Sequence, residues 1–173
     1  MGLSSMKKEL IEEKVANLLY QHGYNAERDD YVDIVKLIKK DGFSVVNALL
    51  PEAEDGFLAI RPVNDEYAKI IGVNANRPIE WKRFVIAQQY ACSILHYENK
   101  KIILHHEIRK RKDAEENDTD YFAAALLMPC KSFKRVFERL KNVELSKHMI
   151  YLNLAVIYGV PIKKAKLRAD HFF

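Results

Sequence analysis

Cys92 and His96 stand four residues apart, a spacing that places both side chains on one face if the segment is helical. A thiolate and an imidazole are both zinc ligands, and the carboxylate of Asp118 could supply a third. The same two residues could instead act as a nucleophile and its base, although burial in a helix raises the pKa of a thiol. Without such chemistry, Cys92 would pack as a small apolar side chain and His96 would lie at the helix end.

A second group with ligand chemistry is His105-His106-Glu107. Adjacent side chains on a strand point to opposite faces, so at most one of these imidazoles could join a site with His96. We interpret the run as an exposed, charged connector. The basic run at 109–112 could contact phosphates, but three acidic residues follow it closely, which is typical of a solvated surface.

The tail of the chain carries a signal for DNA binding. Residues 152–168 have the pattern of a helix, a Gly-containing turn and a second helix. Between residues 131 and 173, ten Lys and Arg stand against three Asp and Glu. A basic second helix suits the DNA backbone, and the contacting residues would be Lys163, Lys164, Lys166 and Arg168. The helix lacks a set of Asn, Gln and Arg for reading bases, so DNA binding is kept as an alternative.

Hydrophobic periodicity predicts the elements that must position these residues. Seven helices are predicted, at 7–22, 31–40, 79–96, 118–127 and 132–140, with two more in 145–173 that are broken at 159–161. Asp30 is the predicted cap of the second helix. Short apolar and β-branched segments predict three strands at 43–47, 56–60 and 69–74, and 101–105 could add a short one. Helices, then strands, then helices again predict an α+β fold.

Two segments carry a resemblance to a known family. They are Arg83 to His96, with the sequence RFVIAQQYACSILH, and Phe122 to Pro129, with the sequence FAAALLMP. In this order they resemble the ImmA/IrrE family of zinc metallopeptidases, whose pattern is R-F-x-x-A-H-E-x-G-H-x-x-L-H and later E-x-N-x-F-A-A-x-L-L-M-P. The resemblance implies a zincin-like domain at 1–130, with a small three-stranded sheet packed on helices. A helical, helix-turn-helix-like extension would follow at 131–173.

The chain departs from this family at the catalytic positions. His-Glu-x-x-His in the family supplies two zinc ligands and the base that takes a proton from the zinc-bound water. Gln88, Gln89 and Cys92 stand at those positions here, and Asp118 stands where the family has its third ligand, a Glu. An amide is a poor zinc ligand and cannot act as a base near neutral pH. We therefore expect no catalytic residues, no resident metal and no cofactor, with Cys92, His96 and Asp118 as the weak alternative zinc ligands.

The resemblance implies a partner as well as a fold. Active family members are implicated in cleaving helix-turn-helix repressors of phages and mobile elements. The first hypothesis is therefore a catalytically degenerate relative, a pseudoenzyme, that binds a repressor-like protein partner in a phage or mobile-element context. The second is an active zinc-dependent endopeptidase with an unusual ligand set, and the third is a DNA-binding regulator. The residues that would bind a protein partner and the oligomeric state are left open.

The amino-acid composition limits the classes of protein to which this chain could belong. The chain has 173 residues, 49% of them hydrophobic, and 28 Lys and Arg against 24 Asp and Glu. This balance is globular, and the net charge of +4 is too small to imply nucleic acid by itself. Two cysteines exclude a disulfide scaffold and suit a reducing compartment. With no secretory signal and an apolar run that ends well short of a membrane span, a cytoplasmic protein with no membrane partner is expected.

Overall fold

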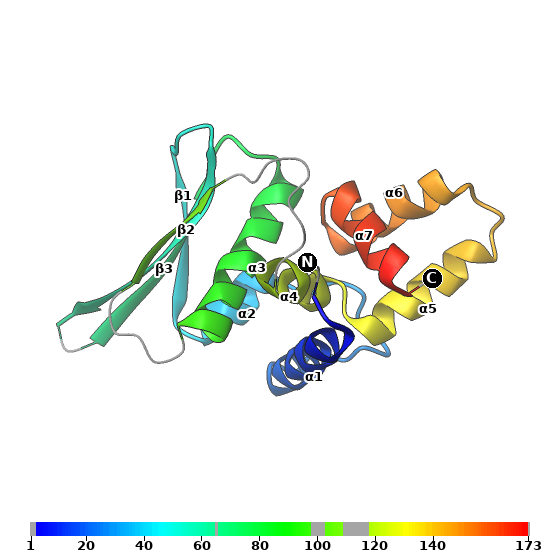
Figure 1. The fold of residues 1–173 in the computed structure, drawn as a ribbon, viewed down its shortest axis with the longest axis horizontal. Helices are drawn as coiled ribbons and strands as arrows, with labels where there is room; N and C mark the ends of the chain where they lie inside the picture. Colours follow the sequence, from blue (N-terminus) through cyan, green and yellow to red (C-terminus); the bar gives the residue numbers. More distant parts are fainter. Residues whose placement is uncertain (1–2, 65, 98–102, 109–117, 173) are drawn as a thin grey trace.

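The computed structural model describes residues 3–64, 66–97, 103–108 and 118–172. Its helices and strands form the α+β fold that the sequence predicts (Figure 1). The helices are α1 (Ser5–Gln21), α2 (Ile34–Lys40), α3 (Ile79–His96), α4 (Asp118–Leu127), α5 (Cys130–Lys141), α6 (Lys147–Tyr158) and α7 (Ile162–Phe172). The strands are β1 (Phe43–Ala48), β2 (Glu54–Val63), β3 (Glu66–Asn74) and β4 (Ile103–Ile108).

The sheet has four strands in the order β1-β3-β2-β4. β1 runs parallel to β3, whereas β2 is antiparallel to both β3 and β4. The expected three strands are all present, and β4 extends the sheet beyond β2. His105-His106-Glu107 therefore lies within a strand, and its interpretation as a connector is wrong. The short strand expected at 101–105 is present in its described part, but it continues to Ile108 through charged residues whose side chains break the apolar alternation on which strand prediction depends.

The sheet packs on α3, and α4 lies on the far side of α3 from the sheet (Figure 1). Leu58 and Ile71 of the sheet are fully buried, and so is Phe84 of α3. Gly72 of β3 lies opposite Phe57 of β2, and a Cβ at this glycine would stand 2.1 Å from the phenylalanine ring. A side chain larger than hydrogen at position 72 would therefore have to displace the Phe57 ring.

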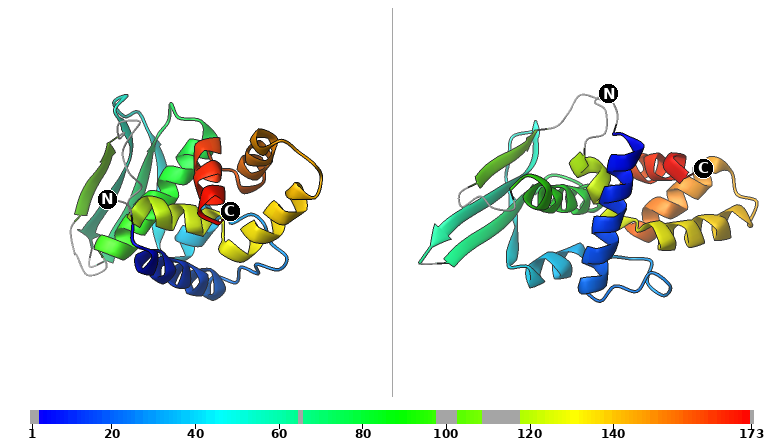
Figure 2. Two further views of the ribbon diagram at one scale, coloured as in Figure 1. Left: turned by 45° about the vertical axis from the view of Figure 1, so that its right-hand side comes forward. Right: turned by 60° about the horizontal axis from the view of Figure 1, so that its bottom comes forward.

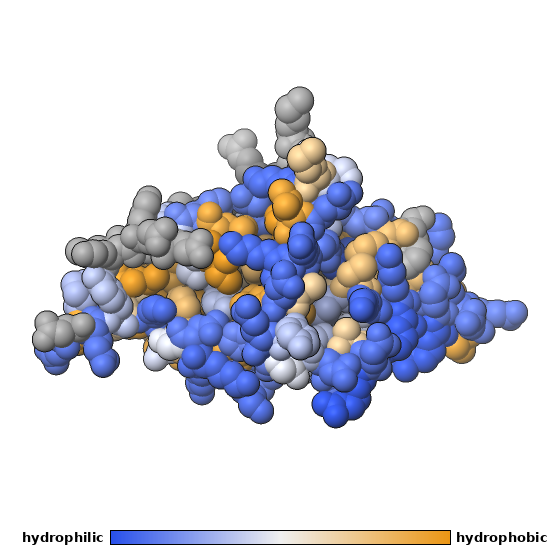
Figure 3. All heavy atoms as spheres, turned by 90° about the horizontal axis from the view of Figure 1, so that it is seen from below, coloured by the Kyte–Doolittle hydropathy of each residue, from blue (hydrophilic) through white to orange (hydrophobic). Residues whose placement is uncertain are grey.

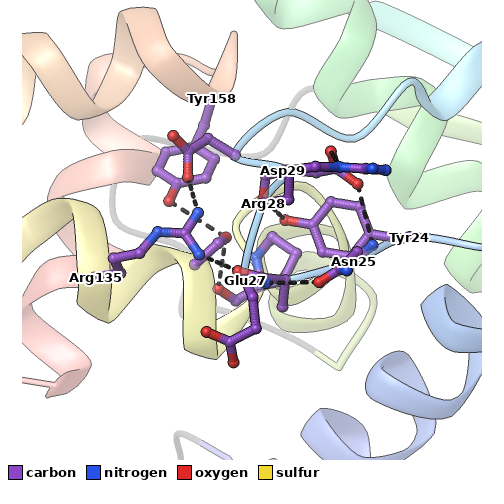
Figure 4. A network of polar contacts seen from close by, with 11 residues as sticks. Tyr24, Asn25, Glu27, Arg28, Asp29, Arg135 and Tyr158 are labelled. Carbon is purple, nitrogen blue, oxygen red and sulfur yellow. Dashed lines mark hydrogen bonds and ion pairs between the residues drawn. The ribbon is translucent and has the colours of Figure 1, made fainter.

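The helix α2 begins three residues later than predicted, because Asp33 and not Asp30 caps it. The Asp33 carboxylate accepts a hydrogen bond from the Lys36 backbone N–H at 3.0 Å. Asp30 instead pairs with the guanidinium of Arg135 from α5, which also donates to the carbonyl of Ala26. Figure 4 shows the Arg135 side chain directed toward the segment that carries Glu27 and Arg28. These contacts tie the segment between α1 and α2 to the C-terminal helices.

Helices α5, α6 and α7 lie at the end of the domain away from the sheet (Figure 1). α6 and α7 form the predicted pair, and the turn between them uses Gly159, which has a φ of 58°. Figure 2 shows α1 lying across the domain beside α4. No helix within the described residues is long and apolar enough to cross a membrane.

Candidate functional site

The candidate site lies where α3 and α4 pack against each other. Helix α3 is buried on nearly all sides through its middle, because the sheet covers one face and α4 another. Gln88 is 8% exposed and Gln89 is fully buried. Both amides therefore lie in the protein interior, where each polar atom needs a partner within the protein or in a ligand.

Gln88 is bonded to α4. Its Nε2 donates a hydrogen bond to Oδ1 of Asp120, which stands where the family pattern has Asn. In zinc sites, a carboxylate commonly accepts a hydrogen bond from the second nitrogen of a metal-bound His and so orients that ring. The contact between Gln88 and Asp120 has the same donor and acceptor arrangement, with an amide in place of the imidazole.

Asp120 has a cationic neighbour as well. Nζ of Lys164, in α7, lies 3.7 Å from the same Oδ1 and 4.5 Å from the centre of the Phe84 ring. The Lys164 side chain is 14% exposed. A lysine predicted to contact DNA is thus directed into the domain, where its ammonium places a positive charge beside the α3–α4 contact.

Gln89 stands at the position of the family's general base. Its Oε1 lies 3.4 Å from Nδ1 of His105 in β4, so this residue links α3 to the end strand of the sheet. Its Nε2 is buried and has no hydrogen-bond partner within the described part of the chain. An amide at this position cannot accept a proton from water near neutral pH.

The three residues considered as alternative zinc ligands are only partly brought together. Nε2 of His96 lies 3.4 Å from Oδ1 of Asp118, and Nζ of Lys7 lies 3.1 Å from Oδ2 of the same carboxylate. Cys92 is buried in α3. In the ranges that the structure describes, no three residues of the His, Cys, Asp and Glu types form a group that could hold a metal ion.

The carboxylate of Asp118 is held in its charged form. Burial acts to raise its pKa, but the hydrogen bond from Lys7 and the charge of His96 outweigh this effect and leave the pKa below the ordinary value. Asp118 thus forms an ion pair with the first turns of α1. This contact uses the carboxylate that the family resemblance assigns to the metal.

This donor set does not fit a zinc ion. Gln88 directs its amide N–H groups, not its oxygen, toward Asp120, and Lys164 places a cation where a second cation would be repelled. Asp118 is engaged by Lys7 and His96. The arrangement is able to hold α3, α4 and α7 together.

The other residues predicted to contact DNA divide into two groups. Lys163 and Lys166 are exposed on α7. Arg168 is 2% exposed, and it donates to the carbonyl of Met128 at 3.1 Å and to the carboxylate of Glu12. Arg168 is therefore directed into the protein. The basic run at 109–112 lies outside the described residues.

A comparison with known families identifies the fold. The profile of the IrrE N-terminal-like domain matches residues 42–170, from β1 to α7. The chain belongs to this family. The match confirms the resemblance to ImmA/IrrE proteins that the segments around α3 and α4 indicate, and it covers most of the chain. A search of curated proteins finds no match.

The sequence analysis did not predict the roles of Asp120 and Lys164. The signal lay in the spacing of α7, where Lys164 and Arg168 stand one helical turn apart on either side of the buried Ala165. Small residues beside a pair of cations indicate a helix that packs closely and directs charge inward. The net charge of residues 131–173 does not reveal this, because a net charge does not distinguish side chains directed into the protein from those directed to solvent.

Proposed function

We propose that this protein is a catalytically degenerate member of the IrrE N-terminal-like family that binds a protein partner without cleaving it. The main support is the buried amide pair, Gln88 and Gln89, at the positions of a zinc ligand and the general base. One amide bonds Asp120 and the other contacts His105. A site that still required metal and water would need an imidazole and a carboxylate there.

The end strand of the sheet supports partner binding. β4 pairs with β2 on one side, and among the described strands none pairs with its other side. Such an edge presents backbone groups to which an extended peptide can add as a further strand. Leu104 of β4 is 69% exposed, and His105 in the same strand contacts Gln89 of the degenerate site.

The class of partner follows from the family. Active relatives are implicated in cleaving helix-turn-helix repressors of phages and mobile elements, and a degenerate relative retains a fold able to hold the same kind of protein. The proposed partner is therefore a repressor-like protein. Binding without cleavage would sequester the repressor or shield it from a working peptidase.

The loss of the metal site is tested by elemental mass spectrometry on protein purified without a metal-affinity tag. We expect less than about 0.1 equivalent of zinc, even after incubation with excess zinc followed by dialysis, because the ligand set is absent. The thermal unfolding midpoint should be the same with and without a chelator. Near-stoichiometric zinc would contradict the proposed degeneracy.

Partner binding is tested by placing a photo-crosslinking amino acid at Leu104. A repressor from a phage or mobile element of the same host serves as the probe. We expect a crosslinked product from Leu104 and none from Leu49, which is 84% exposed and follows β1 at the opposite edge of the sheet. The repressor should remain uncut. Cleavage, or equal crosslinking from both positions, would refute the proposal.

A further inference from the structure

Helix α6 presents an apolar stripe to solvent. Met149, Leu152 and Val156 are 44%, 36% and 80% exposed, and their spacing places them on one side of the helix. The opposite side of α6 packs through Ile150 and Leu154, which are buried. The residues of the stripe therefore do not take part in packing α6 onto the domain. Helix α6 lies at the end of the domain away from the sheet (Figure 1).

Basic side chains border this stripe. A hollow of about 410 Å³ between α6 and α7 is lined by His148, Tyr151, Ile162, Lys163 and Lys166. His148 lies one helical turn before Leu152, and Lys163 and Lys166 are exposed on the α7 side. Seen from below, the face of the molecule opposite to this surface is mostly hydrophilic (Figure 3). The α6–α7 surface combines an apolar strip with a hollow and a positive border.

We infer that this α6–α7 surface binds an amphipathic helix whose apolar face is flanked by Asp and Glu. Apolar side chains of such a helix would cover Leu152 and Val156, and its carboxylates would face Lys163 and Lys166. The inference deepens the proposed function, because it rests on the protein having a protein partner and assigns that partner a second contact, remote from β4.

The same residues favour a protein over DNA. An exposed Val and Leu have no counterpart on a phosphate backbone, whereas they are the usual anchors of a helix in a groove. Two of the four cations predicted for DNA, Lys164 and Arg168, are directed inward to Asp120 and Glu12. The outward charge that remains is small for a DNA-binding surface, which commonly neutralises several phosphates.

The test uses the full chain and two synthetic helical peptides with one shared apolar face. One peptide carries Glu on both flanks and the other carries Lys. We expect the acidic peptide to bind, as measured by fluorescence anisotropy, and the basic peptide to bind at least about tenfold more weakly. The double variant K163E/K166E should lose about tenfold in affinity for the acidic peptide, and V156D should lose a similar factor. The matched control K36E/K39E, with the same charge change on exposed lysines of α2, should bind as the wild type does.

If neither peptide binds, the inference is wrong. Equal binding by K163E/K166E and the wild type would also overturn it. Retention of duplex DNA that K163E/K166E abolishes, together with no peptide binding, would assign the surface to nucleic acid instead. This test can be told apart from the crosslinking test of the proposed function. If only the α6–α7 surface is misassigned, the V156D variant should still give a crosslinked product at Leu104.

Discussion

The ammonium of Lys164 in α7 lies 3.7 Å from a carboxylate oxygen of Asp120 in α4, and this same oxygen accepts a hydrogen bond from Gln88 in α3. Three helices from distant parts of the sequence therefore meet at one carboxylate. In the family pattern, the α3 and α4 positions belong to a zinc centre. In this chain a lysine of the C-terminal tail lies beside the α4 carboxylate, and the contact joins α7 to α3 and α4.

Removing this cation should destabilise the fold. Lys164→Met leaves the carboxylate of Asp120, 7% exposed, without its charged neighbour, and we expect a loss of about 2 kcal/mol in the free energy of unfolding. Asp120→Asn in the same background should recover part of the loss, because no unpaired charge remains. Urea unfolding of the single and double variants measures the coupling. Lys163→Met, at the exposed neighbouring position, should stay within about 0.5 kcal/mol of the wild type. Additive effects at Lys164 and Asp120 would show that the two residues do not interact.

A second junction is formed by Arg168. Its guanidinium bonds both the Met128 carbonyl and the Glu12 carboxylate, which a lysine cannot reproduce. Arg168→Lys should therefore cost about 2 kcal/mol despite the conserved charge. The reverse change at an exposed position of the same helix, Lys166→Arg, should be neutral. Equal stability of the two variants in urea would exclude a structural role for the two contacts of the Arg168 guanidinium.

The elements of the site could be predicted from sequence because they depend on local patterns. The bounds of α3 and α4 follow from apolar spacing, from Pro78 ahead of α3 and from the segment that ends at Pro129. The packing of these two helices follows from the family resemblance. The lack of an imidazole and a carboxylate at 88 and 89 can be read directly from the residue types.

The partners of those residues could not be predicted, because they come from remote elements. Lys7 reaches Asp118 and Lys164 reaches Asp120 only after α1 and α7 have packed on α4. The cap of α2 was assigned to Asp30 for a similar reason, since nothing local indicates that Arg135 engages that carboxylate. Ion pairs between remote elements leave no periodic signal in a sequence. For this reason the partners of Asp118, Asp120 and Asp30 could not be predicted.

The ion pair of Asp118 makes stability depend on pH. Its pKa is lower in the folded protein than the ordinary value of 3.8. The unfolded state therefore binds the proton more readily, and the stabilisation is present above the unfolded pKa and is lost as the pH falls through the folded one. The wild type should be more stable than Asp118→Asn above about pH 5, and the difference should shrink as the pH falls below the unfolded pKa of 3.8. Urea unfolding at a series of pH values checks this. A difference that grows toward low pH would contradict the assignment.

The turn between α6 and α7 should tolerate no side chain. Gly159 has a φ of 58°, and a Cβ there would lie 3.2 Å from both the Arg83 side chain and the Tyr31 ring. Gly23 has a φ of 80° with nothing within 4 Å of the same Cβ, so it isolates the cost of the backbone conformation. We expect Gly23→Ala to cost about 1 kcal/mol and Gly159→Ala to cost more, with the excess due to the contacts with Arg83 and Tyr31. Equal losses in thermal unfolding would show that these two side chains move aside without penalty.

The scaffold should regain zinc when its ligands are restored. The triple variant Q88H/Q89E/C92H places two imidazoles one helical turn apart with a carboxylate between them, as the family pattern does. We expect this variant to retain zinc after dialysis while the wild type does not. Adding Lys7→Ala should strengthen zinc binding several-fold, because it releases Asp118 from its ion pair. Adding Asp118→Asn should weaken binding if that carboxylate is the third ligand. A folded triple variant that binds no zinc would show that restoring the ligands is not enough for zinc binding. The ion pair of Lys164 with Asp120 would then be the remaining obstacle, and adding Lys164→Met should restore zinc binding.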